Sequence, residues 1–172
     1  MLPRASHEQG LGAIAFAAVG TREDVVGFFG AYLYADGSCT EVDLDGTQPA
    51  TPVTPWLFLS IHDSDVATVR YAPGGSGTGE AFLGNTPRNY WENPDASAPT
   101  NPALEADSLA SWTRVAQTGA APAAETIEAF LASDEKEGPD DDADVPDEDV
   151  FVELKCVRFL GALGLPLPRD LT

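Results

Sequence analysis

Apolar runs and alternating patterns in the first half of the chain predict β-strands. Trp56–Ile61 is an apolar run, and Val66–Tyr71 alternates apolar with polar side chains. Because only four polar residues separate these two segments, they are predicted to pair as a hairpin. Ser38–Leu44 alternates in the same way, and Glu80–Leu83 follows a flexible, glycine-rich turn at 73–79. Together these segments predict an antiparallel sheet of sequential strands.

The segment before the first alternating strand fits two kinds of element. Its apolar residues recur at intervals of three and four, as on one face of a helix: Val25, Phe28, Phe29, Tyr32 and Leu33. This spacing predicts a helix that begins near Thr21 and ends near Asp36. Gly27 and Gly30 lie inside it, and each costs about 1 kcal/mol relative to alanine in a helix, so a pair of strands is the alternative. Farther upstream, Leu11–Val19 is too short to span a bilayer and predicts a buried strand.

The second half of the chain has helical periodicity. Ala103–Gln117, Pro122–Ala132 and Val150–Leu163 each carry an apolar face at helical spacing, the last as a helix or as a strand that leads into one. Asn85–Pro102, with its four prolines, is predicted to be a loop. Strands followed by helices predict the α+β class. We expect one globular domain over residues 1–172, with about three helices packed on one face of an antiparallel sheet.

Charge narrows the choice of partner. The chain has 28 acidic and 9 basic residues, a formal charge of −19. About half of it lies in the acidic run, residues 134–149, which we predict to be a mobile loop. Such a surface repels phosphate, which argues against nucleic acids and anionic membranes as partners. It favours a basic protein, because opposite charges speed encounter and select the partner; the alternative is that the charge serves solubility.

Clusters typical of catalysis or metal binding do not stand out in the sequence. The two histidines and two cysteines are scattered. An EF-hand loop that began at Asp140 would need Gly at position 145 and Glu at position 151, where Val145 and Phe151 stand. We therefore expect no metal or other cofactor and no enzymatic activity, with a small enzyme as the alternative. Cys39 and Cys156 are expected to be buried thiols, which fits a reducing cytoplasm.

Two adjacent aromatic residues, Tyr90 and Trp91, stand in the polar segment predicted as a loop, with Arg88 close before them. Tyr, Trp and Arg are the side chains that most often anchor protein interfaces. The alternative is that both rings cover one end of the core. The predicted partner-binding residues combine these three with carboxylates of the acidic run: Arg88, Tyr90, Trp91, Asp140, Asp141, Asp142, Asp144, Asp147, Glu148 and Asp149.

The stretch Leu57–Ala132 resembles the immunity proteins of bacterial polymorphic toxin systems, in the α+β group that guards against deaminase toxins. The resemblance lies in the hairpin LFLSIHDSDVATVRYAP, the glycine-rich turn, the aromatic segment NYWENP and a helix that closes in TGAAP. The chain departs from this family after Pro122, where a further helix replaces the family's last, tryptophan-bearing strand. The acidic run and Val150–Leu163 have no counterpart in the family.

The resemblance implies a cytoplasmic, non-catalytic inhibitor that binds one toxin domain. A toxin that acts on nucleic acid has a basic cleft for phosphates, and an inhibitor can fill that cleft with carboxylates. The expected function is therefore neutralisation of a basic nuclease or deaminase toxin domain through an acidic surface. The alternatives are an acidic housekeeping domain, and a small enzyme or ligand binder with a site near the NYWENP segment.

Overall fold

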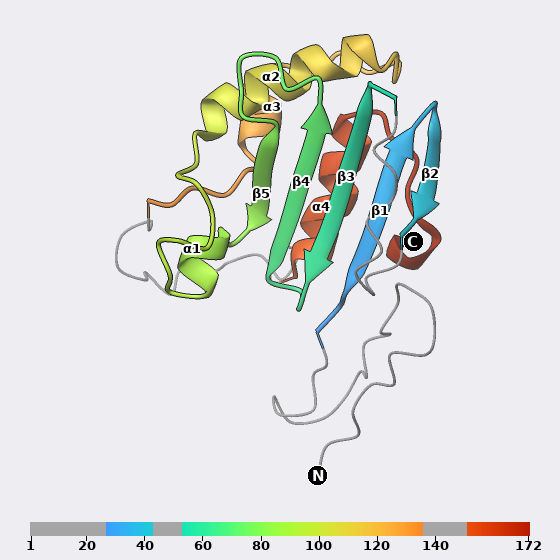
Figure 1. Cartoon of the computed structure of the whole chain (residues 1–172). Coiled ribbons are helices and arrows are strands. Elements are labelled where there is room, and N and C mark those ends of the chain that lie inside the picture. Colours follow the sequence, from blue (N-terminus) through green and yellow to red (C-terminus); the bar gives the residue numbers. More distant parts are fainter. Residues whose placement is uncertain (1–26, 43–52, 136–150) are drawn as a thin grey trace.

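One antiparallel sheet of five strands forms the centre of the molecule (Figure 1). The computed structural model describes residues 27–42, 53–135 and 151–172. The strands lie in the spatial order β2-β1-β3-β4-β5. Their bounds are Gly30–Ala35 (β1), Ser38–Glu41 (β2), Trp56–His62 (β3), Val66–Ala72 (β4) and Glu80–Gly84 (β5). The predicted strands from β2 onward are confirmed, and β3 and β4 pair as the predicted hairpin.

Helices cover one face of this sheet. The described helices are α1 (Pro87–Tyr90), α2 (Pro102–Val115), α3 (Ala124–Glu128), α4 (Val152–Ala162) and a short 3₁₀ turn, η3 (Arg169–Leu171), and α2, α3 and α4 pack on this face. Figure 1 shows α4 behind β3 and β4, and α2 across the upper end of the sheet. Buried side chains of α2, α3 and α4 share one core with those of the strands, so the α+β class is confirmed. None of the helices in the described ranges is both long and apolar enough to cross a membrane.

The segment whose apolar spacing predicted a helix contains a strand instead. β1 turns through Asp36 and Gly37 into β2. Both turn residues have a positive φ, 51° and 73°, as a two-residue hairpin turn requires, and Asp-Gly is a preferred pair there. β1 lies between β2 and β3 and carries apolar residues on both faces, so it lacks the alternation that marks a half-exposed strand. The helix prediction is therefore wrong for residues 27–36, which hold a single strand, while residues 21–26 lie outside the described residues.

The register of the strands places a row of apolar side chains under the helices. Tyr32 of β1 pairs with Leu59 of β3, which pairs with Val69 of β4. All three side chains are buried, and Leu109 of α2 and Phe159 of α4 belong to the same core. Burial of side chains of this size contributes about 1.5–3 kcal/mol each, so this layer between sheet and helices dominates the stability of the fold.

α2 is fixed to one end of the sheet by the buried side chain of Trp112. Its indole N–H donates to the carbonyls of Trp56, at the start of β3, and Ala72, at the end of β4, each at 3.1 Å. Moving the ring would leave two carbonyls at the sheet end without this donor, which is costly when the groups are buried. Trp112 therefore stands in a fixed orientation at this end of the sheet.

A buried carboxyl group holds the glycine-rich turn between β4 and β5 against α2. Glu105 is 3% exposed and accepts hydrogen bonds from the Tyr71 hydroxyl and from the amide and hydroxyl of Thr78, the last two at 2.6 and 2.9 Å. Ser108, one helical turn later, accepts from the Gly77 amide at 2.8 Å. A Cβ atom at Gly77 would lie 2.6 Å from the Glu105 carboxyl, so a larger residue there would displace this buried acceptor. The turn is thus tied to α2 by three hydrogen bonds.

Two buried tyrosines differ in whether their hydroxyl has a partner. Tyr71 donates to Glu105, whereas the Tyr32 hydroxyl has no hydrogen-bond partner within the described residues. Burial raises the pKa of both phenols, so both hydroxyls stay protonated. The Tyr71 hydroxyl is therefore a satisfied buried polar group, and the Tyr32 hydroxyl is an unsatisfied one.

Removing these two hydroxyls is expected to affect stability differently. Tyr71→Phe should lower the free energy of unfolding by about 1–2 kcal/mol, because the buried carboxyl group of Glu105 loses a donor. Tyr32→Phe should leave it unchanged or raise it by about 0.5–1 kcal/mol, because an unpaired buried polar group disappears. Urea unfolding of both variants measures the difference. Equal losses would contradict the hydrogen bonding described.

The segment after α3 covers the edge of β5. α3 ends at Glu128, earlier than the predicted end at Ala132. Leu131 forms a β-bridge with Leu83, and the Ala132 amide donates to the Phe82 carbonyl at 2.7 Å. These residues pair with the strand and cannot continue the helix, which explains why the apolar periodicity overestimated its length. The pairing also covers backbone groups that an edge strand would otherwise leave open.

Two predictions fall outside the described residues. The buried strand expected at Leu11–Val19 lies there, as does the mobile loop expected over the acidic run, except for Asp134 and Glu135. Both stay predictions. The same holds for the assignment of the whole chain, residues 1–172, to a single domain.

A buried chain of hydrogen bonds holds the turn between β3 and β4. The Ser64 hydroxyl accepts from the Phe28 amide at 2.7 Å and donates to Oε1 of Glu153 at 3.2 Å. Glu153 is 5% exposed, and its Oε2 has no hydrogen-bond partner in the described part of the chain. Burial raises the pKa of this carboxyl group above its usual 4.5, although the hydrogen bond from Ser64 opposes the rise.

The stability of the protein relative to a Glu153→Gln variant is expected to fall as the pH rises. An acid whose pKa is higher in the folded state holds its proton more tightly when the chain is folded. Its contribution to stability is complete below the unfolded value of 4.5 and is lost as the pH rises through the folded pKa. Urea unfolding at about pH 4, 6 and 8 measures this difference, with exposed Glu125→Gln as the control. A difference that stays constant with pH would contradict the burial of Glu153.

Candidate partner-binding surface

α1 is a single helical turn inside the segment predicted as a loop. Thr86 caps it, because its side chain accepts from the Asn89 amide at 3.3 Å, and Pro87 occupies the first helical position. Glu92, with a positive φ of 48°, follows the turn. The loop prediction is wrong for these four residues, and the Thr-Pro pair is a start signal that it overlooked. The turn leaves Trp91 at the surface, 49% exposed.

Four rings form what we call the Trp91 patch: Phe29, His62, Tyr90 and Trp91. The His62 ring, at the end of β3, lies with its centroid 5.0 Å from that of Phe29, 5.9 Å from Tyr90 and 5.5 Å from Trp91. The Tyr90 and Trp91 rings meet edge to face, with centroids 5.0 Å apart. Aromatic rings attract each other at these separations. His62 therefore connects the sheet to α1 and supports the exposed indole.

Two carboxyl groups, those of Asp63 and Asp65, interact with Tyr90 of the Trp91 patch. The Tyr90 hydroxyl donates to Oδ2 of Asp63 at 3.0 Å, and burial together with Asp63 raises the pKa of this phenol. Asp65 stands two residues after Asp63, and Glu92 directly follows Trp91. Burial and, to a smaller extent, the neighbouring Asp63 raise the pKa of Asp65. A cation brought to these groups would relieve their mutual repulsion.

α1 also contacts the chain that follows α3. Nη1 of Arg88 lies 3.9 Å from Oδ2 of Asp134, and the Asn89 side-chain amide donates to the Ser133 carbonyl at 3.3 Å. Two hydrogen bonds with Thr100 also fix Asp134. The Thr100 amide donates to Oδ2 of Asp134 at 2.8 Å, and the Thr100 hydroxyl accepts from the Asp134 amide at 3.1 Å. These contacts join the Trp91 patch to the residues that lead into the acidic run.

An acidic groove of about 590 Å³ lies beside Asp134. The start of α2, the end of α3 and residues 133–135 line it. All ionisable side chains among its lining residues are acidic: Glu128, Asp134 and Glu135. The groove therefore offers a second place, connected to the Trp91 patch through α1, where lysine or arginine side chains of a partner would find carboxylates.

The predicted partner-binding residues fall into two groups. Arg88, Tyr90 and Trp91 lie on or beside α1, but only the two aromatic residues join the Trp91 patch, because Arg88 pairs with Asp134. Arg88 is thus engaged within the chain and is not a free anchor. The other predicted residues lie outside the described residues and stay predictions: Asp140, Asp141, Asp142, Asp144, Asp147, Glu148 and Asp149.

Sequence reasoning missed half of the Trp91 patch. Phe29 and His62 face each other because Gly30 and Ile61, their neighbours, are paired across β1 and β3. β2 separates these two strands in the sequence, so only the full strand order reveals the contact. The sequence showed only an aromatic residue just before β1, Phe29, and a histidine at the end of β3, His62. Without the strand order, these two positions do not indicate a contact.

The described residues offer no group of three or more His, Cys, Asp or Glu side chains arranged to hold a metal ion. Cys156 is buried, Cys39 is half-buried, and both are free thiols. Burial raises the pKa of both thiols, which makes them weak nucleophiles at neutral pH. Comparison of the chain with protein-family models, curated proteins and solved structures finds no match.

Proposed function

We propose that the protein is a non-enzymatic inhibitor of a basic toxin domain of the nuclease or deaminase class. It acts as an immunity protein in the bacterial cytoplasm and binds the toxin through the Trp91 patch and the carboxylates beside it. One observation carries the proposal: a half-exposed tryptophan ring rests on His62 and Tyr90, Asp63 and Asp65 lie beside Tyr90, and Glu92 follows the tryptophan in the sequence. The carboxylates replace phosphates in the basic cleft of the toxin, and the indole anchors the contact.

Trp91 has the properties of an interface anchor. It is the one aromatic member among the large apolar side chains that are exposed in the described residues: Val53, Trp91, Val115, Leu154 and Leu167. Its ring is already held by His62 and Tyr90, so binding would order little that is mobile. A pre-ordered tryptophan with polar surroundings is the kind of side chain on which binding energy concentrates.

The charge of the described residues supports a basic partner even without the rest of the acidic run. They hold 15 carboxylates against six lysines and arginines, a formal charge of −9. Two of the six, Arg70 and Arg88, pair with Glu80 and Asp134 at 3.5 and 3.9 Å. A net negative charge of this size attracts a basic protein over several ångströms and speeds encounter.

Co-expression tests the proposal. The genes adjacent to this one are searched for a C-terminal nuclease or deaminase domain, and that domain is expressed in a bacterial host, alone and together with the full chain. We expect growth arrest with the toxin domain alone, growth with both proteins, and a one-to-one complex on size-exclusion chromatography. If the adjacent genes encode no toxin domain, or if arrest persists although the chain is folded and abundant, the proposal is wrong.

A further inference from the structure

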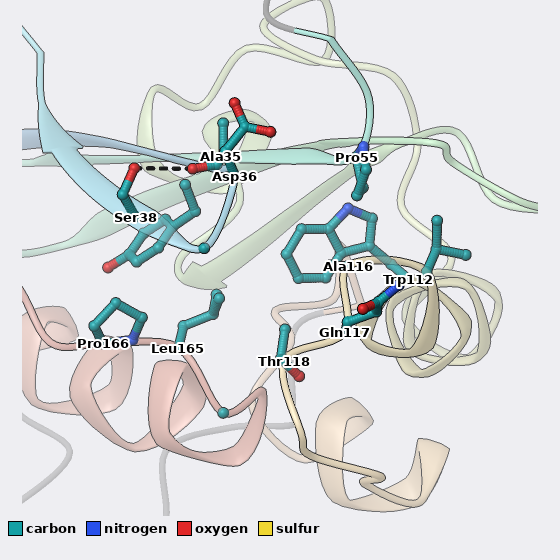
Figure 2. Close-up of a pocket in the computed structure, with 14 residues that line it drawn as sticks. Ala35, Asp36, Ser38, Pro55, Trp112, Ala116, Gln117, Thr118, Leu165 and Pro166 are labelled. Atoms are coloured by element: carbon teal, nitrogen blue, oxygen red, sulfur yellow. Dashed lines mark hydrogen bonds between the residues drawn. The ribbon is translucent and has the colours of Figure 1, made fainter.

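A second concave site lies at the opposite end of β3 from the Trp91 patch. Pro55, just before β3, lines it, whereas His62, the last residue of β3, belongs to the patch. This cavity has a volume of about 530 Å³, within the range of sites that hold small molecules. Figure 2 shows Trp112 of α2 on one side, with Leu165 and Pro166 from the chain after α4 on another.

Two helices end at this cavity. α2 ends in a Schellman motif, in which the amides of Gln117 and Thr118 donate back to the helix at 3.3 and 3.2 Å. α4 ends in the same motif, through the amides of Gly164 and Leu165 at 3.1 and 2.9 Å. All four residues line the cavity. Because the carboxyl end of a helix carries about half a negative charge, the two ends together make the cavity electronegative.

The lining side chains add to this negative character. None of them is basic, and the exposed Asp36 is acidic. The Trp112 indole is held by its hydrogen bonds to the sheet and is only 2% exposed, so it forms a fixed apolar wall of the cavity. The cavity thus combines two helix carboxyl ends with an acid, and both features favour positive charge.

The backbone at Gln117 departs from the usual way of ending a helix. Its φ is +53°, a conformation that normally falls to glycine, as at Gly164 in the equivalent position of α4 with φ +71°. A residue with a side chain in this region costs about 1 kcal/mol or more, and strain of this kind collects at functional sites. Here it places an amide-bearing side chain in the cavity wall.

We propose that this cavity binds a free organic cation, an ammonium or guanidinium group on a short apolar body. The positive group lies near Asp36 and the ends of α2 and α4, and the apolar body contacts Leu165 and Pro166. The site shares no residue with the Trp91 patch. Its test is therefore independent of the proposed inhibitor function.

Titration of the full chain with two matched ligands tests the proposal, with 2-phenylethylammonium as the cation and 2-phenylethanol as its neutral counterpart. The readout is the NMR resonance of the Trp112 indole N–H, assigned with Trp56→Phe and Trp91→Phe variants. We expect the cation to shift this resonance with a dissociation constant below about 1 mM, and the alcohol to bind at least about tenfold more weakly. Equal affinities, or no shift with about 10 mM cation, would overturn the proposal.

Substitutions test whether the carboxylate of Asp36 contributes to binding of the cation. Asp36→Asn should weaken binding of the cation about 2- to 5-fold and leave the alcohol unchanged, and asparagine tolerates the positive φ of 51° at this turn position. Asp107→Asn, an exposed acid on α2 that does not line the cavity, is the matched control and should change neither ligand. Ala116→Leu narrows the cavity and should weaken both. An equal loss of cation affinity in Asp36→Asn and Asp107→Asn would mean that overall charge alone attracts the ligand.

Discussion

Trp91→Ala is expected to weaken binding of the toxin domain at least about 30-fold, the equivalent of about 2 kcal/mol. The indole is 49% exposed and rests on His62 and Tyr90, so the substitution removes an ordered apolar anchor without opening the core. Trp91→Phe, which keeps a ring, should lose less affinity. Titration calorimetry of the full chain with the toxin domain measures all three dissociation constants.

Leu154→Ala is the matched control for this experiment. Leu154 is 45% exposed on α4 and lies outside the Trp91 patch. Its substitution should change the affinity less than about 3-fold. Urea unfolding should show that both alanine variants keep the fold. Similar losses of affinity in the two variants would rule out Trp91 as the anchor.

Glu105→Ala should have the largest effect on stability, lowering the free energy of unfolding by about 3–4 kcal/mol. The carboxyl group accepts from the Tyr71 hydroxyl and from the amide and hydroxyl of Thr78. Alanine leaves all three donors without this partner and opens space between α2 and the glycine-rich turn. Urea unfolding measures the loss.

Two further variants make this result specific. Glu105→Gln keeps the shape and some of the hydrogen bonds, so it should cost about half as much as alanine. Asp107→Ala, exposed on the same helix, should stay within about 0.5 kcal/mol of the parent protein. A loss of less than about 1 kcal/mol in Glu105→Ala would mean that the network does not hold the turn against α2.

Much of the sheet could be predicted from local patterns. β3 and β4 are adjacent in sequence, and their apolar runs are separated by a short polar turn, so their pairing needed no distant information. The helix predicted through Phe28 and Tyr32 was wrong for a physical reason: a strand with apolar residues on both faces has them at positions that also fit a helical stripe. The Asp36-Gly37 pair was the local signal that favoured strands.

The candidate site could be predicted only in part. Tyr90 and Trp91 are neighbours in the sequence, so their pairing was visible there. Phe29 and His62 reach them through the pairing of β1 with β3, which depends on the order of all the strands. The burial of Glu105 could not be predicted from the sequence either. An acid on an amphipathic helix is ordinarily exposed, and only the fold brings donors from Tyr71 and Thr78 to this one.

The dependence of the association rate on salt tests the central claim most directly, namely that an acidic surface of this chain binds a basic toxin domain. Stopped-flow association of the two proteins is measured from about 20 to about 500 mM salt, with the parent chain and with a double variant, Asp65→Asn and Glu92→Gln. We expect the rate constant of the parent chain to fall at least about tenfold over this range, because salt screens the attraction, and the double variant to start slower and fall less. A rate constant that is the same at both ends of the range, for the parent chain and the double variant alike, would contradict the account.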